Sequence, residues 1–380
     1  NIPWGRTGWT WRDDEFRQWV DERILAAISY NQAGKQFDVS LQITIPNEWQ
    51  KLAPINIGYT AGIETSRVAP LWLQKGNEMN QIITISKHSM ETYQSTVVQA
   101  QNSQTGQVFD YRLSTPIEVV NYAVDKPNTT ESIDGFELEY DFNFLCVSQW
   151  GPRKNMENTI RWFFEEFKND EVGMVVKTNI VNDSLTDYFH TNRMLGQIKA
   201  LYPDHKCKVY LLHGDLSREQ LSGLYSHEKI GALVNLAHGE GFGLPMFEAA
   251  YHGVPVVAVG WSGQLDFLVD EDGNSHFYSV DFTMQPIQKE AHWEGVLESN
   301  SLWAFADSDS AKAQMRLCYQ EAQQSRQEAG FYANHLSERF STEKMYEKFI
   351  NSMGIVQDMV EEQKARDEIE EMFRELELDD

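Results

Sequence analysis

The sequence predicts an α/β protein made of two doubly wound domains. Its 380 residues exceed what one hydrophobic core normally serves, since a domain averages roughly 150 residues. Short runs rich in β-branched residues alternate with helix-like segments in two successive series, which favours parallel sheets covered by helices. A polar, acidic passage over residues 126–141 separates the two series. We therefore expect two domains with a cleft between them.

The first series opens with a predicted helix over residues 13–33. Apolar side chains recur there at helical spacing: Phe16, Trp19, Val20, Ile24, Ala27 and Ile28. Strands are predicted within 37–45, 55–60, 81–86 and 108–125. Because an α/β domain normally begins with a strand, we expect the first strand of this domain to lie upstream of Asn1. Residues 1–135 are assigned to this N-terminal domain.

The second series carries five predicted strands with helices between them, which is the pattern of a doubly wound sheet. The strands fall within 142–148, 172–178, 208–214, 232–237 and 254–259. Helices are predicted over 156–167, 185–201, after Ser217, and over 246–251, 308–328 and 337–350. Ser217 and Gln220 have the spacing of a capping box. Residues 141–335 are assigned to this C-terminal domain, and 336–354 to a helix that packs back toward the first domain.

The chain is strongly acidic. Its formal net charge is −25, and residues 355–380 hold 11 acidic against 3 basic side chains. This charge argues against general affinity for nucleic acid or for an anionic membrane. Within the acidic tail, Ile369, Met372, Phe373 and Leu376 share one helical face. The tail is therefore either a helix that binds a protein partner or a solvated, partly disordered extension.

Cysteine usage and hydropathy indicate the compartment. Cys146, Cys207 and Cys318 are isolated and have no metal-binding spacing, which fits a reducing environment. No apolar run is long enough to span a bilayer, and residues 1–16 contain neither a basic leader nor the apolar core of a signal peptide. We expect a cytoplasmic protein with no transmembrane segment, no metal site and no bound cofactor.

The most informative segment runs from Glu240 to Glu248, in the order Glu-Gly-Phe-Gly-Leu-Pro-Met-Phe-Glu. It follows a predicted strand and leads into a predicted helix. A glycine-rich turn at such a place exposes backbone N–H groups at the start of the helix, where a phosphate or a sugar oxygen is favoured. The two carboxylates can accept hydrogen bonds from sugar hydroxyls. The candidate ligand-binding residues between them are Gly241, Phe242, Gly243 and Leu244.

This segment resembles the E-x7-E element of retaining glycosyltransferases of the glycogen-synthase and mannosyltransferase-like kind (glycosyl transferases group 1). A second segment, VSQWGPRKN at residues 147–155, is similar to the family element that ends the first strand of the second domain. Lys154 falls on the family's diphosphate-binding lysine, and Arg153 lies beside it. Gln149 departs from the pattern, because the family usually has an arginine there. Lys177 resembles a lysine found in one branch of the family.

The resemblance implies the GT-B fold, in which two Rossmann-like domains face a cleft. It implies that the first domain binds the acceptor and the second a nucleotide sugar. Glu240 would be the catalytic residue that holds the transferred sugar and Glu248 would hold the ribose, while Arg153, Lys154 and Lys177 would bind the diphosphate without a metal. Acceptor or phosphate binding is assigned to Glu64, which stands in a region where many relatives have a histidine, and to the glycine loop with Gly5 and Gly8, for which an ordinary turn is the alternative.

The expected function is transfer of a sugar, with retention, from a UDP- or GDP-linked donor to a hydroxyl acceptor. That acceptor would be a glycan, a lipid-linked or a small molecule. One alternative is a non-catalytic module of a larger assembly that binds nucleotide sugars or glycans. Others are a glycosyltransferase acting on modified DNA bases, which the net charge disfavours, and an epimerase or phosphorylase of the same layout.

Overall fold

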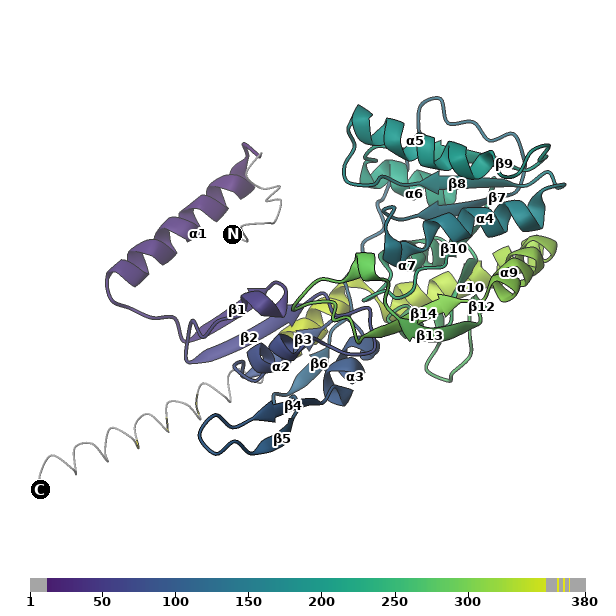
Figure 1. The fold of residues 1–380 in the computed structure, drawn as a ribbon. Coiled ribbons are helices and arrows are strands. Elements are labelled where there is room, and N and C mark those ends of the chain that lie inside the picture. Colours follow the sequence, from purple (N-terminus) through teal and green to yellow (C-terminus); the bar gives the residue numbers. More distant parts are fainter. Residues whose placement is uncertain (1–11, 353–360, 362–364, 366–368, 370–380) are drawn as a thin grey trace, which may run out of the picture.

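The computed structural model describes residues 12–352, 361, 365 and 369. It has a mixed α/β fold with two separate parallel sheets, each in one of two Rossmann-like domains (Figure 1). The predicted fold class is thereby confirmed. Gly5 and Gly8 lie outside the described residues, as does nearly all of the acidic tail, so the expectations for these parts of the chain stay predictions.

The N-terminal domain contains one parallel sheet and one antiparallel hairpin. Its elements are α1 (Glu15–Gln32), β1 (Val39–Ile43), β2 (Ile55–Thr60), α2 (Pro70–Gly76), β3 (Gln81–Thr84), α3 (Lys87–Ser95), β4 (Val98–Gln101), β5 (Val108–Tyr111) and β6 (Ile117–Val119), with a 3-10 turn at Pro46–Glu48. The four-stranded sheet has the order β1-β2-β3-β6. β2 and β3 are almost wholly buried, which is why their residues form continuous apolar runs instead of alternating.

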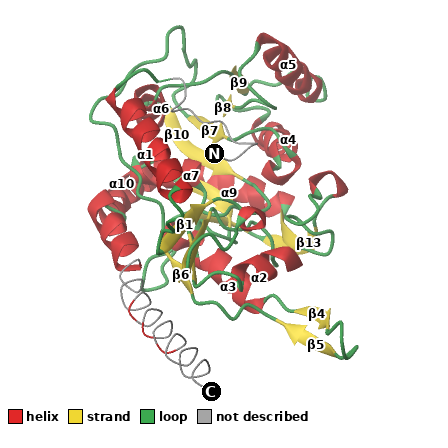
Figure 2. Cartoon of the chain, turned by 90° about the vertical axis from the view of Figure 1, so that its left-hand side faces the viewer, coloured by secondary structure: helices red, strands yellow, loops and turns green. Residues whose placement is uncertain are grey.

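Two parts of this domain are exposed. β4 and β5 form an antiparallel hairpin that projects from the body of the protein (Figure 2). The sequence indicated strand structure over 108–125 but not this pairing. α1 confirms the predicted helix and begins after Asp14, whose side chain accepts a hydrogen bond from the N–H of Arg17. None of its described residues is buried, and Figure 1 shows it standing apart from the sheet.

The C-terminal domain carries a larger sheet. Its elements are β7 (Asn143–Val147), a 3-10 turn (Pro152–Lys154), α4 (Met156–Phe167), β8 (Gly173–Lys177), α5 (Leu185–Lys199), β9 (Lys208–Leu212), α6 (Arg218–Ser226), β10 (Ile230–Asn235), α7 (Leu244–Tyr251), β11 (Val256–Val259), α8 (Leu265–Leu268), β12 (Tyr278–Val280), β13 (Phe282–Pro286), a 3-10 turn (Lys289–Ala291), β14 (Leu302–Ala306), α9 (Ser308–Gln320) and α10 (Ala322–Arg339). The six-stranded sheet has the order β12-β11-β10-β7-β8-β9, and all of its strands are parallel. β13 and β14 form a separate antiparallel pair that the sequence did not predict.

The amphipathic pattern of α4 fixes this helix against the sheet. Ile160, Phe163, Phe164 and Phe167 recur at helical spacing and are fully buried. The ring of Phe167 packs on that of Phe144 in β7, with 5.4 Å between the ring centroids. This contact packs the C-terminal end of α4 against β7.

The late helices differ from the prediction in their boundaries. One helix was expected over 308–328 and another over 337–350. The chain instead breaks at Glu321 into α9 and α10, α10 continues to Arg339, and the last helix covers residues 342–352. Neither glycine nor proline marks the break, so the sequence carries no local signal for it. None of the helices in the described part of the chain is long and apolar enough to cross a membrane.

The two domains contact each other directly. The main chains of Ser66 and Leu302 are joined by an N–H to carbonyl bond of 2.8 Å, and the Leu302 N–H donates to Ser66 Oγ at 3.0 Å. The carboxylate of Asp266 accepts from the N–H of Lys87 at 3.0 Å and from the amide of Asn121 at 2.9 Å. The bonds of Asp266 link segments that follow β3, β6 and β11 at the carboxyl ends of the two parallel sheets, whereas Leu302 is the first residue of β14.

Candidate functional site

Three loops of the C-terminal domain meet at the carboxyl edge of its sheet. β7 pairs with β8 so that Val147 lies opposite Lys177, and the N–H of Ser148 donates to the Lys177 carbonyl at 3.2 Å. β10 adjoins β7 on the other side and runs into the segment that contains Glu240. Because the carboxyl ends of parallel strands share one edge, residues distant in sequence converge there.

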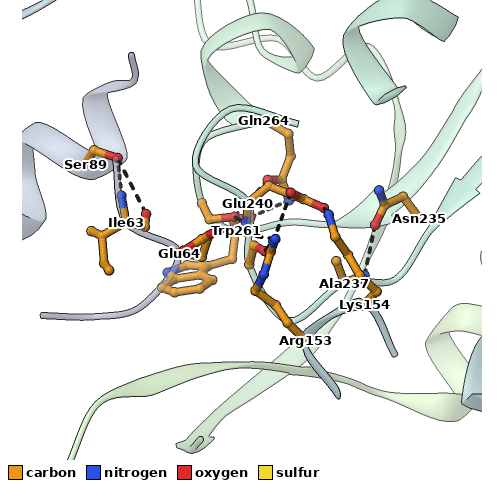
Figure 3. A network of polar contacts seen from close by, with 12 residues as sticks. Ile63, Glu64, Ser89, Arg153, Lys154, Asn235, Ala237, Glu240, Trp261 and Gln264 are labelled. Atoms are coloured by element: carbon orange, nitrogen blue, oxygen red, sulfur yellow. Dashed lines mark hydrogen bonds and ion pairs between the residues drawn. The ribbon is translucent and has the colours of Figure 1, made fainter. Parts of the chain in front are cut away.

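Glu240 forms ion pairs with both cations of the loop after β7. Its Oε2 lies 3.0 Å from Nη1 of Arg153, and its Oε1 contacts Nζ of Lys154 (Figure 3). Only 6% of Glu240 is exposed. The Arg153 Nη1 also donates to the Gly239 carbonyl at 2.7 Å. The structure thus brings together three of the residues predicted for the donor site.

The members of this cluster hold one another in their charged forms. Burial alone would raise the pKa of Glu240, but Lys154 and Arg153 keep that pKa below its usual value. Burial alone would lower the pKa of Arg153, but the carboxylates of Glu64 and Glu240 raise it above its usual value. Burial lowers the pKa of Lys154, and Glu240 opposes this shift.

The backbone after β7 sets the positions of the two cations. Pro152 starts a 3-10 turn that ends at Asn155, whose φ of 51° lies in the left-handed region. The Asn155 amide donates to the Leu236 carbonyl at 3.2 Å, and the His238 N–H donates to the Arg153 carbonyl at 2.8 Å. These bonds tie the loop after β7 to the loop after β10, so that Arg153 reaches Glu240.

The turn between the two glutamates is shaped by glycine and proline. Gly243 has a φ of 96°, which favours glycine, and α7 begins at Leu244 followed by Pro245. Phe242 is only 2% exposed, and its ring packs against that of Phe267 with 5.1 Å between centroids. Of this predicted ligand-binding turn, Phe242 therefore belongs to the core, whereas Leu244 is 40% exposed.

The N-terminal domain lies directly against two glycines of this segment. A Cβ atom added at Gly241 would lie 2.6 Å from the carbonyl oxygen of Ala61, and one at Gly239 would lie 2.1 Å from the carbonyl oxygen of Glu64. The sequence predicted Gly241 as one of the ligand-binding residues of this turn. In the structure, the loop of residues 61–64 makes this close approach.

Glu64 joins the charge cluster from the other domain. Its Oε1 lies 3.3 Å from Nη2 of Arg153, and both side chains are 26% exposed (Figure 3). Burial, reinforced by the Glu64 charge, raises the pKa of the neighbouring Tyr122. Glu64 was predicted to bind the acceptor or a phosphate, and it lies beside Arg153, which was predicted to bind the diphosphate.

Glu248 lines a pocket of its own. The pocket has a volume of about 310 Å³ and is also lined by Arg218, Tyr225 and Tyr251, but not by any of the three cluster residues of the C-terminal domain. The Tyr225 hydroxyl donates to Glu248 Oε2 at 3.0 Å. Burial raises the pKa of Glu248, and this hydrogen bond opposes the shift.

Gln149 and Lys177 lie at the neighbouring strand ends. The Gln149 amide donates to the Ile180 carbonyl at 2.7 Å and so ties the loop after β7 to the loop after β8. Burial lowers the pKa of Lys177, while Asp183 and Asp215 oppose the shift.

Within the described ranges, no group of three or more His, Cys, Asp and Glu side chains is arranged to hold a metal ion.

The sequence did not reveal the part played by the loop after β11. Ser262, at a φ of 80°, accepts a hydrogen bond from the N–H of Glu240 through its Oγ at 3.0 Å. Trp261 packs edge-on against His88 of the N-terminal domain, with 4.7 Å between ring centroids. The only signal in the sequence is the pair Gly260 and Gly263 after a predicted strand, which marks a turn but not its contacts.

Solved structures of glycosyltransferases with the GT-B fold share this architecture. Sucrose-phosphate synthase from Thermosynechococcus elongatus has a TM-score of 0.58 at 11% identity, over 89% of this chain and 78% of the enzyme. OtsA has a TM-score of 0.56 at 10% identity, over 90% of this chain and 79% of OtsA. Anabaena HepE, solved with UDP and glucose, has a TM-score of 0.53 at 15% identity, over 79% of this chain and 71% of HepE.

Other comparisons are less extensive. The matched part covers only about half of S. aureus TarM, 51% of its length, and of pneumococcal GtfA, 52%. No model of a known protein family matches the sequence, and no curated protein matches it. At these low identities the similarity establishes the fold.

Proposed function

We propose that this chain is a retaining glycosyltransferase that moves a sugar from a UDP- or GDP-linked donor to a hydroxyl acceptor. The observation that carries the proposal is the cluster of Arg153, Lys154 and Glu240 at the carboxyl edge of a doubly wound sheet. Nucleotides bind at this edge in α/β proteins. Two adjacent cations suit a diphosphate, and a carboxylate suits the hydroxyls of a sugar.

Each candidate residue has a role in this proposal. Arg153 and Lys154 bind the diphosphate, and Lys177 at the next strand end adds positive charge. The main-chain N–H groups of residues 241–244 face the phosphate or sugar oxygens. Glu240 holds the transferred sugar, and Glu248 holds the ribose in its pocket of about 310 Å³. The N-terminal domain supplies the acceptor side of the cleft.

The chemistry follows from these roles. The bond between the sugar C1 and the diphosphate oxygen breaks, and a bond from C1 to the acceptor oxygen forms on the same face. The acceptor proton passes to an oxygen of the departing diphosphate. Arg153 and Lys154 stabilise the charge that develops on the leaving group, so the scheme needs no divalent cation. Glu240 orients the sugar for attack.

A donor screen tests the proposal. Purified protein is incubated in EDTA with UDP- and GDP-linked sugars, beginning with UDP-glucose because HepE was solved with UDP and glucose. Release of nucleoside diphosphate is followed by chromatography. We expect the wild type to hydrolyse one donor slowly, and we expect Glu240→Gln and Lys154→Ala to lose this hydrolysis. The control Lys51→Ala removes an exposed lysine and should hydrolyse the donor as the wild type does. NMR of the product anomer then tests retention. Turnover only with a divalent metal, or unaffected variants, would contradict the proposal.

A second candidate is a non-catalytic module that binds nucleotide sugars. Two observations favour it: Glu240 already neutralises part of the charge of Arg153 and Lys154, and Gln149, in place of an arginine, is bound to the main chain of Ile180. The same screen separates the two candidates. Binding of a donor without any hydrolysis, and without transfer to acceptors in a cell extract, would favour the module.

A further inference from the structure

The charges around Arg153 balance in the described structure. Arg153 and Lys154 are cations, and Glu240 and Glu64 are the two carboxylates that contact them. A donor diphosphate would add further negative charge to a group that is already neutral. Favourable binding therefore requires one carboxylate to leave, because charge-assisted bonds to phosphate depend on uncompensated cations.

Glu64 is the carboxylate that can leave. Glu240 is 6% exposed, contacts both cations and has its main chain fixed by Ser262. Glu64 contacts only Arg153 in this cluster, at 3.3 Å, and 26% of its side chain is exposed. It also belongs to the other domain, so its position depends on how the two domains meet.

The loop that carries Glu64 is held against the donor segment. The N–H of Ile63 donates to Ser89 Oγ at 3.1 Å, and Ser66 is bound to Leu302 of the C-terminal domain at 2.8 Å. The carbonyl oxygen of Glu64 lies so close to Gly239 that a Cβ there would be 2.1 Å away. The two domains therefore touch at this point, and the Glu64 carboxylate is directed at the guanidinium of Arg153.

We propose that Glu64 is an internal counter-anion of Arg153, which the diphosphate of the donor displaces. This inference rests on the proposed function, because it takes a nucleoside diphosphate as the ligand of Arg153. Displacement breaks the ion pair between the domains and so removes one of the contacts that hold the loop of residues 61–64 against the C-terminal domain. Donor binding is thus coupled to the position of a loop in the acceptor domain, and Glu64 weakens donor affinity instead of contributing to it.

Calorimetric titration with UDP and with inorganic pyrophosphate, in EDTA, tests whether a diphosphate competes with Glu64 for Arg153. Glu64→Gln keeps the shape of the side chain and removes its charge. We expect the Kd of Glu64→Gln for UDP and for pyrophosphate to be roughly threefold to tenfold lower than that of the wild type, because a partly exposed ion pair no longer competes with the ligand. Glu91→Gln removes the same charge from an exposed position of the same domain and controls for the overall charge. Melting curves check the fold, and Glu64→Ala serves as a second variant.

A double-mutant cycle separates competition from a structural role. In an Arg153→Gln background, Glu64→Gln should no longer tighten binding, because its partner is gone. If wild type binds UDP through Arg153 but Glu64→Gln matches Glu91→Gln or binds more weakly, the counter-anion proposal is overturned and the proposed function stands. If wild type and Glu64→Gln both fail to bind UDP, pyrophosphate or any nucleotide sugar, both proposals fail.

Discussion

Arg153 and Glu64 come from different domains, and their charged groups lie 3.3 Å apart. Glu240 contacts the same guanidinium at 3.0 Å from within the C-terminal domain. The guanidinium is therefore shared between a buried carboxylate of its own domain and a partly exposed carboxylate of the N-terminal domain. This arrangement makes the charge state of the proposed donor site depend on both domains.

Glu240→Gln should destabilise the fold. Glu240 is 6% exposed and is the counter-charge of both Arg153 and Lys154. Its neutralisation leaves these cations poorly compensated, so we expect the free energy of unfolding to fall by about 1–3 kcal/mol. Urea denaturation at neutral pH measures this. Glu157→Gln removes a surface ion pair with Arg161 and should change stability little, and an equal loss in both variants would contradict the account.

The stabilisation from Glu240 should disappear in acid. Its pKa in the folded protein lies below the ordinary value of 4.5, because Lys154 and Arg153 outweigh the effect of burial. A carboxyl group with a lowered folded pKa contributes stability above its unfolded pKa and loses it as the pH falls through the folded pKa. The stability gap between wild type and Glu240→Gln should therefore be full at pH 6 and shrink below about pH 4.5. A difference in unfolding free energy between wild type and Glu240→Gln that stays constant down to pH 3 would show that the ionised carboxylate of Glu240 is not its cause.

Glu248→Gln should separate stability from binding. Burial raises the pKa of Glu248, so the charged form is disfavoured in the folded state. The stability that this group contributes is present at low pH and is lost as the pH rises through the raised pKa. At neutral pH the glutamine variant should melt at the same temperature as wild type or higher, yet bind UDP more weakly. Lower stability with unchanged UDP affinity would show that Glu248 is a structural residue.

Gly239→Ala should push the domains apart. Its Cβ would lie 2.1 Å from the main-chain oxygen of Glu64, which cannot move independently of its loop. We expect a loss of about 1–3 kcal/mol in stability and a larger radius of gyration in X-ray scattering. Gly151→Ala is the matched control, because it has no atom within 4 Å of the added Cβ and an extended φ of −156°. Equal behaviour of the two variants would argue against the close contact.

Local patterns in the sequence were enough to predict much of the C-terminal domain. α4 spans Met156–Phe167 as its apolar stripe predicts, and the capping box at Ser217 is present. The convergence of Arg153, Lys154 and Glu240 was also predictable, since each follows a buried strand and parallel strands end at one edge. The individual roles of these residues, like those of Lys177 and Glu248, remain predictions.

The rest depends on contacts between distant segments. The β4–β5 hairpin is mostly exposed, so its sequence has no pattern of buried residues that would predict it. The β13–β14 pair joins Phe282–Pro286 to Leu302–Ala306 across an intervening loop, which no local pattern predicts. The pairing of Glu64 with Arg153 requires the two domains to meet in one orientation, which no local pattern encodes. The same holds for Ser262, whose contact with Glu240 arises from a loop between two other elements.

The measurement that tests the central claim most directly is the Kd of the donor found in the screen, titrated in EDTA into wild type and Lys154→Ala. Lys154 contacts the buried carboxylate of Glu240 and is 16% exposed. If the cluster is the donor site, wild type binds saturably and Lys154→Ala binds at least roughly tenfold more weakly, since a charge-assisted contact to the diphosphate is lost. An unchanged Kd in Lys154→Ala would contradict the assignment of the donor site.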